Sequence, residues 1–450
     1  MSDALAKHYP AHLETVRRHF DAALRAAHCE QVAVYAGAPH LQFLDDYPYP
    51  FKANPHFKYW LPLTAAPESL VIYTAGRKPV LLYYQPDDYW HVPPAPPSGY
   101  WVEHFDVRVI KQPEAAREEL PPAKTRAFLG EWREDLRDWG FTAVNPEALI
   151  NPLHYARAAK TTYELECLRR ANGSAARGHR AAEQAFRAGA SEYEIHNAFL
   201  AGSGETDDAL PYHAIVALNE HAATLHYQHW ERDRPSRHLA FLIDAGTQYH
   251  GYASDVTRTY SSESDEFQAL IDAMDREQQA LCAQVKPGVD FRQLHLEAHH
   301  AVGRLLNEFG LTGLSPETAV AERITSTFLP HGLGHLLGLQ THDVGGFMAG
   351  PAGGTLPKPE GHPYLRTTRT LGEGFVVTIE PGLYFIASLL DKLKAEPEGR
   401  HLDWKKVDAF RKFGGIRIED NVVAKAAGPE NLTRDGLRAA GRNLAAPIPV

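Results

Sequence analysis

The chain has 450 residues, of which 44% are hydrophobic and 23% are charged, a balance that excludes collagen-like, coiled-coil and intrinsically disordered proteins. Its 46 Lys and Arg residues against 56 Asp and Glu residues give a formal net charge of −10, so a broadly basic nucleic-acid surface is not expected. One count is unusual: the 25 histidines supply a side chain that both binds metals and titrates near neutral pH.

Residues 1–157 are predicted to form an N-terminal α/β domain. An amphipathic helix is expected over about 11–28, and apolar runs at 32–36, 70–73 and 79–84 are typical of strands. Four prolines crowd the segment between Trp90 and Trp101, which predicts an irregular loop.

Residues 158–450 are predicted to form a second domain of the α+β class. A long helix begins near Thr161 or Thr162 and runs towards residue 188, and the segment 191–194 has the capping-box pattern of a second helix. Strands are expected at 239–245, 253–260, 375–380 and 415–423, with helices at 266–284 and 291–309. Helices laid against antiparallel strands favour the α+β class.

Two of the predicted strands carry an aspartate each, on either side of a turn at 248–251. A hairpin centred between Tyr249 and His250 would place Asp244 directly opposite Asp255. Opposed residues have Cβ atoms about 4.5–5.5 Å apart, where two carboxylates need a cation or a shared proton. A register shifted by one or two residues, with both aspartates in solvent, is the alternative.

Two further strands carry acidic residues among apolar ones. Glu380 ends a strongly apolar strand, where an unpaired carboxylate is costly to bury. In the strand at 415–423, the period of two puts Arg417 and Glu419 on one face and isoleucines on the other. Either strand alone could hold a structural ion pair, but together with the aspartate hairpin they favour a shared site.

The segment 331–338, His-Gly-Leu-Gly-His-Leu-Leu-Gly, is followed closely by His342. Its glycines do not have the dinucleotide-binding spacing, so we discount a Rossmann interpretation. Glycines around His335 instead favour a close approach of the backbone to a neighbouring segment while the imidazoles project.

These residues together predict a dinuclear metal centre. Four carboxylates carry a charge of −4 that two divalent cations would neutralise, and one histidine adds a nitrogen ligand: Asp244, Asp255, Glu380, Glu419 and His335. Oxygen-rich ligation without thiolates favours Mn²⁺ or a similar ion. A pair of such ions about 3.5–4 Å apart generates a bridging hydroxide at neutral pH.

The order of these five residues resembles that of the pita-bread metallopeptidases, which include methionine aminopeptidase, aminopeptidase P and prolidase. The segment 331–343 is similar to the prolidase and aminopeptidase P signature, although Thr341 stands where Val or Ile is usual. Several stretches also resemble bacterial Xaa-Pro dipeptidases and organophosphorus acid anhydrolases: 43–46, 51–57, 60–62, 90–91 and 211–226. The resemblance implies a pita-bread catalytic domain with a curved, mainly antiparallel sheet, and an N-terminal domain for dimerisation.

The resemblance also implies residue roles. Asp255 and Glu419 would bridge two metal ions, Asp244 would hold one ion, and His335 with Glu380 the other. Glu380 would in addition shuttle the proton of the attacking water. The other residues with implied roles are His331 and His342 for substrate and oxyanion, His226, Arg366 and Arg417 for the substrate carboxylate, Tyr212 lining the pocket, and Asp45 and Trp90 reaching a neighbouring subunit's site.

The implied activity is hydrolysis of Xaa-Pro dipeptides with Mn²⁺, or alternatively Co²⁺ or Zn²⁺, in a homodimer. The alternatives are removal of the residue before proline from longer peptides, as in aminopeptidase P, and a non-catalytic binding protein; organophosphorus hydrolysis would be a promiscuous activity.

The cysteines and the N-terminal sequence bear on the compartment. Three scattered cysteines without a Cys-x-x-Cys pair exclude a disulfide scaffold. Residues 1–20 match neither a signal nor a transit peptide, so a cytoplasmic protein without a membrane or nucleic-acid partner is expected. The remaining histidines, such as His299 and His300, are predicted to be surface or packing residues.

Overall fold

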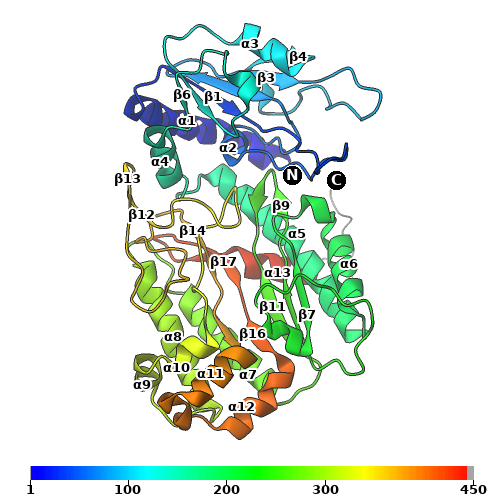
Figure 1. Cartoon of the computed structure of the whole chain (residues 1–450), viewed down its shortest axis with the longest axis vertical. Coiled ribbons are helices and arrows are strands. Elements are labelled where there is room, and N and C mark those ends of the chain that lie inside the picture. The colour runs from blue at the N-terminus through cyan, green and yellow to red at the C-terminus, as the bar shows by residue number, and fades with distance from the viewer. Residues whose placement is uncertain (1, 443–450) are drawn as a thin grey trace. The chain divides into compact units, whose positions relative to one another are not determined.

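The computed structural model describes residues 2–442, which divide into two compact units. The first unit contains the chain up to Cys167, with two short returning segments, His250–Tyr252 and Met348–Gly354. The second unit contains the remainder of the described chain and is built around the later helices and strands (Figure 1). Within residues 2–442, every helix is too short or too polar to span a lipid bilayer.

The first unit is built on a six-stranded mixed sheet with the order β4-β3-β2-β1-β5-β6. Strand β1 pairs antiparallel with β2 and parallel with β5. The strands are β1 Gln31–Tyr35, β2 Leu70–Thr74, β3 Val80–Tyr84, β4 Asp106–Ile110, β5 Arg126–Leu129 and β6 Ala143–Val144. The helices are α1 Ser2–Ala26, α2 Pro55–Trp60, α3 Ala116–Glu119 and α4 Glu147–Ala156, and the short strand β12 Met348–Gly350 returns to this unit.

The three strands predicted in the first unit are confirmed, but its first helix is longer than predicted. Helix α1 runs through Pro10, which we expected to lie before the helix. Leu5 and Tyr9, in the turns before the proline, are almost fully buried. Burial of two such side chains offsets the hydrogen bond that proline cannot donate.

The second unit begins at Leu168, inside helix α5 Thr162–Arg187, and continues with α6 Glu192–Ser203; both helices lie close to their predicted bounds. The predicted capping box at the start of α6 is present, because Ser191 and Glu194 cap each other's backbone amides. The other helices are α7 Glu266–Cys282, α8 Phe291–Glu308, α9 Pro316–Ala321, α10 Ile324–Phe328, α11 Ala387–Ala395, α12 Trp404–Phe410 and α13 Leu432–Arg442.

Two groups of antiparallel strands form the centre of the second unit. One sheet has the order β11-β8-β7, and a second ladder contains β14-β17-β18 and the adjoining pair β15-β16. Their bounds are β7 Ile215–Leu218, β8 Ala240–Asp244, β11 Thr257–Ser261, β14 Val376–Ile379, β15 Gly382–Tyr384, β16 Gly415–Arg417, β17 Asp420–Val423 and β18 Glu430–Asn431. The short strands are β9 Gln248–Tyr249, β10 Tyr252–Ala253 and β13 Gly353–Thr355.

Strand alternation decides which face of the β11-β8-β7 sheet carries polar residues. Phe241 and Ile243 pack in a core with side chains of α5 and α6, which lie alongside these strands in Figure 1. Leu242 faces the other way. Because side chains alternate, Asp244 lies on the same face as Leu242, away from the two helices.

The predicted register of the aspartate hairpin is wrong by two residues. Strand β8 pairs with β11 so that Asp244 lies opposite Thr257 rather than Asp255. His250 and Gly251 both have positive φ, so these two residues make the turn and the centre of the hairpin lies between them. A shift of two keeps Asp255 on the predicted face, two residues before the start of β11.

A buried ion-pair network holds β17 to its surroundings. The carboxylate of Asp420 is fully buried and accepts from Arg258 at 2.6 Å, Arg434 at 2.6 Å and Asn431 at 2.7 Å. Burial alone would raise the pKa of Asp420, but the two guanidinium groups outweigh it and lower the pKa to about 2. The network stabilises the strand that follows Glu419.

We expect Asp420→Asn to lower the free energy of unfolding by about 3 kcal/mol at pH 7, because two arginines lose their buried partner. The native pKa lies below the unfolded value, so this stabilisation is present above about pH 4 and is lost as the pH falls through about 2. In urea denaturation, the difference in the free energy of unfolding between the parent chain and the Asp420→Asn protein should become smaller from pH 7 to pH 3. The exposed Asp435→Asn change is the control. An equal decrease in the free energy of unfolding in that protein would contradict the prediction.

Candidate active site

Three buried groups on different segments of the second unit converge at the centre of the site. Asp255, His335 and Glu419 are at most 5% exposed, and one potential ligand atom from each lies within 4.8 Å of the others. The His335 Nε2 atom is 3.3 Å from the Asp255 carboxylate and 3.6 Å from that of Glu380. The sequence separation between these residues shows that folding, not local structure, assembles the cluster.

Asp244 is held at the edge of this cluster by two hydrogen bonds. It accepts one from the hydroxyl of Tyr212 at 2.8 Å and one from the guanidinium of Arg417 at 2.7 Å. The same guanidinium donates to the Tyr384 hydroxyl and to Thr257 Oγ1, at 2.8 and 3.2 Å. Arg417 is therefore the buried cation that lies among the carboxylates.

Backbone pairing brings the histidine segment to the end of β14. The amides of Thr378 and Glu380 donate to the carbonyls of His335 and Leu333, each at 2.9 Å. A Cβ atom on Gly334 would overlap the carbonyl oxygen of Thr378, so only glycine permits this approach. The predicted role of a glycine beside His335, a close backbone approach, is confirmed at this position.

The ring of His335 is fixed in a tautomer that suits a metal ligand. Its Nδ1 atom lies 3.0 Å from the carbonyl oxygen of Leu336, which can only accept, so Nδ1 carries the proton. Its Nε2 atom then faces the carboxylates of Asp255 and Glu380, to which it donates when the ring is protonated and offers a lone pair to a metal ion when the ring is neutral. Groups arranged in this way in a buried site require a proton or a cation between them.

His331 is oriented by a chain of hydrogen bonds. Its Nδ1 donates to the carbonyl of Gly332 at 2.8 Å, so its Nε2 accepts from the hydroxyl of Tyr384 at 2.8 Å. Burial, and to a lesser degree Arg417, lower the pKa of His331 to about 4. The ring is therefore neutral at neutral pH.

His342 stands edge-on to His335, with ring centroids 4.5 Å apart. Burial and the neighbouring His335 lower the pKa of His342 to about 4, and Arg366 and His226 act in the same direction. Arg366 and His226 are both exposed; both act electrostatically on His342, and His226 also acts on His331.

The pKa values of the carboxylates reflect the electrostatic cost of burying them close together. Burial raises the pKa of Glu380 to about 7 and that of Glu419 well above its usual range, and the other carboxylates add to both. Burial and Asp255 also raise the pKa of Asp244, although Arg417 opposes them. Burial would raise the pKa of Asp255 too, but hydrogen bonding from His335 outweighs it and the pKa is lowered. This excess of negative charge fits divalent cations, which the residues present could hold.

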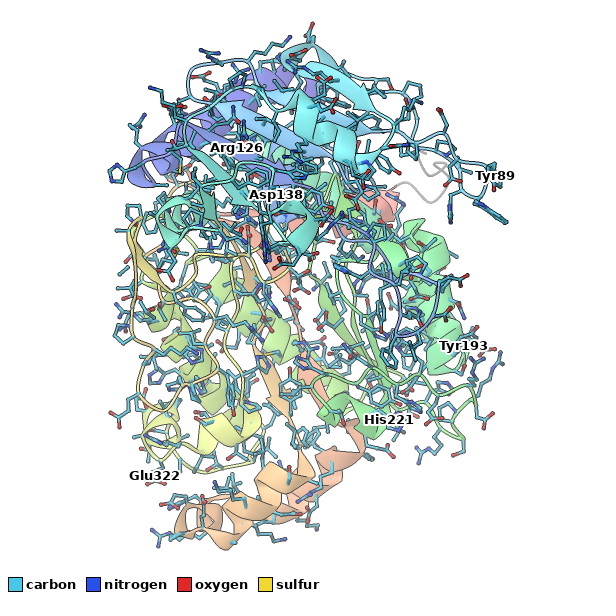
Figure 2. The ribbon with its side chains drawn as sticks, turned by 45° about the horizontal axis from the view of Figure 1, so that its top comes forward. Tyr89, Arg126, Asp138, Tyr193, His221 and Glu322 are labelled. Carbon is cyan, nitrogen blue, oxygen red and sulfur yellow. The ribbon has the colours of Figure 1, made fainter. Side chains whose placement is uncertain are left out.

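Two residues proposed from the resemblance lie in the first unit. Asp45 and Trp90 are both exposed, Trp90 to 78% of its area. Figure 2 shows the adjacent Tyr89 projecting outward from the same loop. Their proposed role at a neighbouring subunit's site remains a prediction.

Sequence reasoning missed two residues that organise the carboxylates. Thr257 donates to Glu419 Oε2 at 2.7 Å, and the Tyr384 hydroxyl joins Arg417 to His331. Thr257 could have been found, because the period of two places it on the face of Asp255. Tyr384 carries no local signal in the sequence.

Two family models match the chain. Residues 7–155 match the N-terminal domain of Xaa-Pro dipeptidases, and residues 166–426 match metallopeptidase family M24. The second match covers the segments that carry all of the clustered carboxylates and histidines described above.

Close relatives match over almost the whole chain. A protein from Xanthomonas axonopodis named Xaa-Pro dipeptidase is 49% identical over 439 residues, which cover 97% of this chain and 99% of that protein. A protein of the same name from Stenotrophomonas maltophilia is 48% identical over 434 residues, covering 96% and 98%.

Solved structures show the same fold. Zinc-substituted aminopeptidase P from E. coli in complex with product superposes with a TM-score of 0.70 at 22% identity, over 97% of this chain and 98% of that one. The complex of aminopeptidase P from E. coli with the inhibitor Pro-Leu also has a TM-score of 0.70 at 22% identity, over 97% and 99%.

We expect metal binding to release protons near neutral pH. The pKa of Glu380 in the metal-free protein is about 7, so below that pH an incoming ion must displace a proton. Apparent Mn²⁺ affinity should therefore rise with pH, by about tenfold per pH unit below 7 on account of Glu380 alone. Titration with Mn²⁺ in weak buffer at pH 6 and pH 8 measures the released protons.

Glu380→Gln removes the titrating group and provides the comparison for that measurement. Proton release at pH 6 should be smaller in this variant than in the parent chain. Equal binding and no proton release between pH 6 and pH 8 in the parent chain would contradict the prediction.

Proposed function

The chain belongs to metallopeptidase family M24, and from this membership we propose that it is a dinuclear-metal dipeptidase that hydrolyses Xaa-Pro dipeptides. It is a hydrolase with the pita-bread fold of that family. The observation that carries the proposal is the buried cluster of Asp255, His335 and Glu419, adjoined by Asp244 and Glu380. The N-terminal match and the names of the 49% identical relatives support proline in the second position of the substrate.

Five residues would hold two divalent ions: Asp244, Asp255, His335, Glu380 and Glu419. Bound at such a site, divalent ions lower the pKa of water and stabilise negative charge on a carbonyl oxygen. The oxygen-rich donor set supports Mn²⁺, with Co²⁺ and Zn²⁺ as alternatives. His335 contributes the one nitrogen, and its Nδ1–H bond to Leu336 keeps that nitrogen directed at the site.

Glu380 is proposed as the proton shuttle. Its raised pKa shows a carboxylate whose environment favours the protonated form near neutral pH. A group with that property can take the proton of the attacking water and give it to the imino nitrogen of proline. Its Oε1 accepts from Thr378 at 3.3 Å, which restricts the rotation of the carboxylate.

His331 and His342 are proposed to contact the substrate as neutral rings. Their lowered pKa values keep them uncharged across the physiological range, so they offer hydrogen bonds without repelling a metal ion. In the described structure both nitrogens of His331 are engaged, by Gly332 and Tyr384. The ring of His342 is therefore less restrained than that of His331 and can reorient more easily towards a substrate.

The substrate carboxylate is proposed to bind to an exposed arginine and an exposed histidine at the edge of the site. Arg366 and His226 are exposed and act electrostatically on His342. Arg417 already bonds Asp244, Tyr384 and Thr257, so its contribution would require it to exchange one of these partners. A closed carboxylate pocket would favour dipeptides over the longer peptides that aminopeptidase P-type activity requires.

A secondary activity and a non-catalytic role are the alternatives to this proposal. A phosphoryl centre is tetrahedral like the intermediate of peptide hydrolysis, so promiscuous organophosphorus hydrolysis is a plausible secondary reaction for this donor set. A non-catalytic role would be marked by the loss of residues from the proposed set of five ligands, and the sequence contains all five. A homodimer and a cytoplasmic location stay predictions.

We expect Asp255→Asn to lower kcat by at least about a thousandfold, because a neutral amide removes one of the central charges. Its side chain is small and isosteric, so the circular dichroism and melting temperature should stay close to those of the parent chain. Asp272→Asn, on the exposed face of α7, is the matched control. Retained turnover in metal-verified Asp255→Asn protein would rule out the proposed mechanism.

We expect Arg366→Ala to lower kcat/KM for Gly-Pro by at least about tenfold and to leave Gly-Pro amide nearly unchanged, because only the first substrate carries the carboxylate. The exposed Arg400→Ala change is the control for loss of a surface charge. The same assay on manganese-loaded parent chain should rank Gly-Pro above Gly-Pro-Ala, and a phosphofluoridate below both. The reverse order of the two peptides would favour the aminopeptidase P-type alternative.

A further inference from the structure

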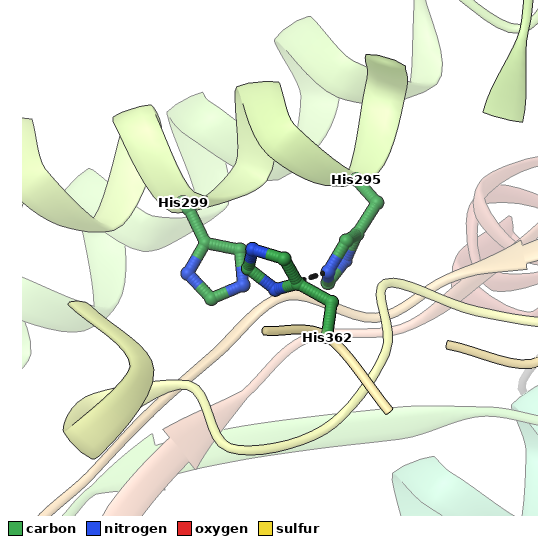
Figure 3. Close-up of side chains that lie close together, drawn as sticks. All are labelled: His295, His299 and His362. Carbon is green, nitrogen blue, oxygen red and sulfur yellow. Dashed lines mark hydrogen bonds between the residues drawn. The ribbon is translucent and has the colours of Figure 1, made fainter. Parts of the chain in front are cut away.

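A second cluster of three histidines lies in the catalytic unit, apart from the carboxylates. His295 and His299 project from α8, four residues and thus about one turn apart, and His362 meets them from a turn before the last strands (Figure 3). The three ring centroids are 4.5 to 4.8 Å apart in every pair. One nitrogen from each ring lies within 4.8 Å of the others.

The donor chemistry of this cluster differs from that of the catalytic centre. Two histidines at positions i and i+4 of a helix present their rings on one face, which is an arrangement that binds zinc in proteins. Neutral imidazoles without carboxylates suit zinc-class transition metals rather than Mn²⁺, Ca²⁺ or Mg²⁺. His295 and His299 are buried and His362 is half-buried, so an ion held here would have one side near solvent.

Within the described part of the chain, one buried nitrogen of the cluster has no hydrogen-bond partner. The Nδ1 atom of His299 lies 3.1 Å from Thr325 Oγ1, whereas its Nε2 atom is buried and unpartnered. His299 itself is 1% exposed. If Nδ1 donates to the threonine, the buried Nε2 lone pair is left to accept, as in a histidine whose other nitrogen is fixed for metal binding.

We propose that His295, His299 and His362 bind a divalent transition metal of the zinc class, separate from the catalytic ions. Three neutral imidazoles leave a fourth position for water. Burial keeps the rings neutral, since it lowers the pKa of His295 to about 2 and that of His299 to about 3. The lone pairs are thus available without displacing a proton from an imidazolium.

The neighbouring charges are compatible with a bound cation. Arg323 is the cation that acts on His362, but its side chain is 67% exposed and lies 4.0 Å from Glu360. Solvent and the glutamate both screen it. His300 is on the same helix and is not part of the cluster.

The proposed site is linked to the catalytic segment through one hydrogen bond. The amide of Leu333, between His331 and His335, donates to Nδ1 of His295 at 3.2 Å. His295 therefore carries its proton on Nε2, which lies 2.9 Å from Nδ1 of His362. An ion bound at Nε2 requires the proton to move to Nδ1, so the Leu333 amide loses its acceptor. This exchange opposes binding and makes the site weaker than a preformed structural zinc site.

The test uses the full chain with Asp255→Asn and Glu419→Gln, which removes two charges from the catalytic centre. Zinc bound after equilibrium dialysis is counted by mass spectrometry, and Co²⁺ absorption reports the ligand geometry. We compare this parent with versions that add His362→Ala, His299→Ala or, as the matched control, His300→Ala. The half-buried His362 is included because its removal disturbs packing less than that of His299.

We expect the His362→Ala and His299→Ala proteins each to bind one equivalent of zinc fewer than the parent, or to bind it at least about tenfold more weakly. The His300→Ala protein should match the parent. Circular dichroism identifies any variant that has not folded. If only one of the His362→Ala and His299→Ala proteins is folded, its zinc binding is the result that tests the proposal. Equal zinc content and affinity in the parent and in the folded variant would overturn the proposal.

Discussion

Repulsion among buried carboxylates constrains the whole second unit. Asp244, Asp255, Glu380 and Glu419 lie around one guanidinium and one imidazole, and three of the four have a raised pKa. At an effective dielectric constant of about 20, two charges 4 Å apart repel by about 4 kcal/mol. Cations, or protons on some of the carboxylates, must offset this repulsion, so metal binding and the stability of this unit are expected to be coupled.

The strands of the second unit position the four carboxylates. Asp244 ends β8 and Glu380 follows β14, both of them buried and mainly apolar strands, whereas Asp255 precedes β11 and Glu419 precedes β17. Apolar burial fixes the position of the strands, and the ladder through β14 and β17 continues in register so that Ile379 lies opposite Asp420. The hydrophobic core thus supplies the free energy that holds like charges together.

Much of this arrangement could be predicted from local patterns, and the remainder depends on tertiary contacts. The predicted hairpin pointed to Asp255 and strand alternation to Glu419, and a capping box identified the start of α6. The hairpin register was wrong because His250 adopts a positive φ that nothing in its neighbours indicates. Tyr384 and the partnership of His299 with His362 involve segments distant in sequence, so periodicity could not reveal them.

The segment 331–335 separates two kinds of donor chemistry. On one side, the Nε2 atom of His335 faces the carboxylates of Asp255 and Glu380, and on the other, the Leu333 amide donates to His295. A hard ion gains little from three neutral imidazoles, whereas a zinc-class ion is suited to them. Because the backbone between the two sets is shared, a change in the hydrogen bond on the histidine side would reach His331 and His335 directly. The type of ligand atom, rather than the distance between the sites, would then direct a hard ion to the carboxylate cluster and a zinc-class ion to the histidine cluster.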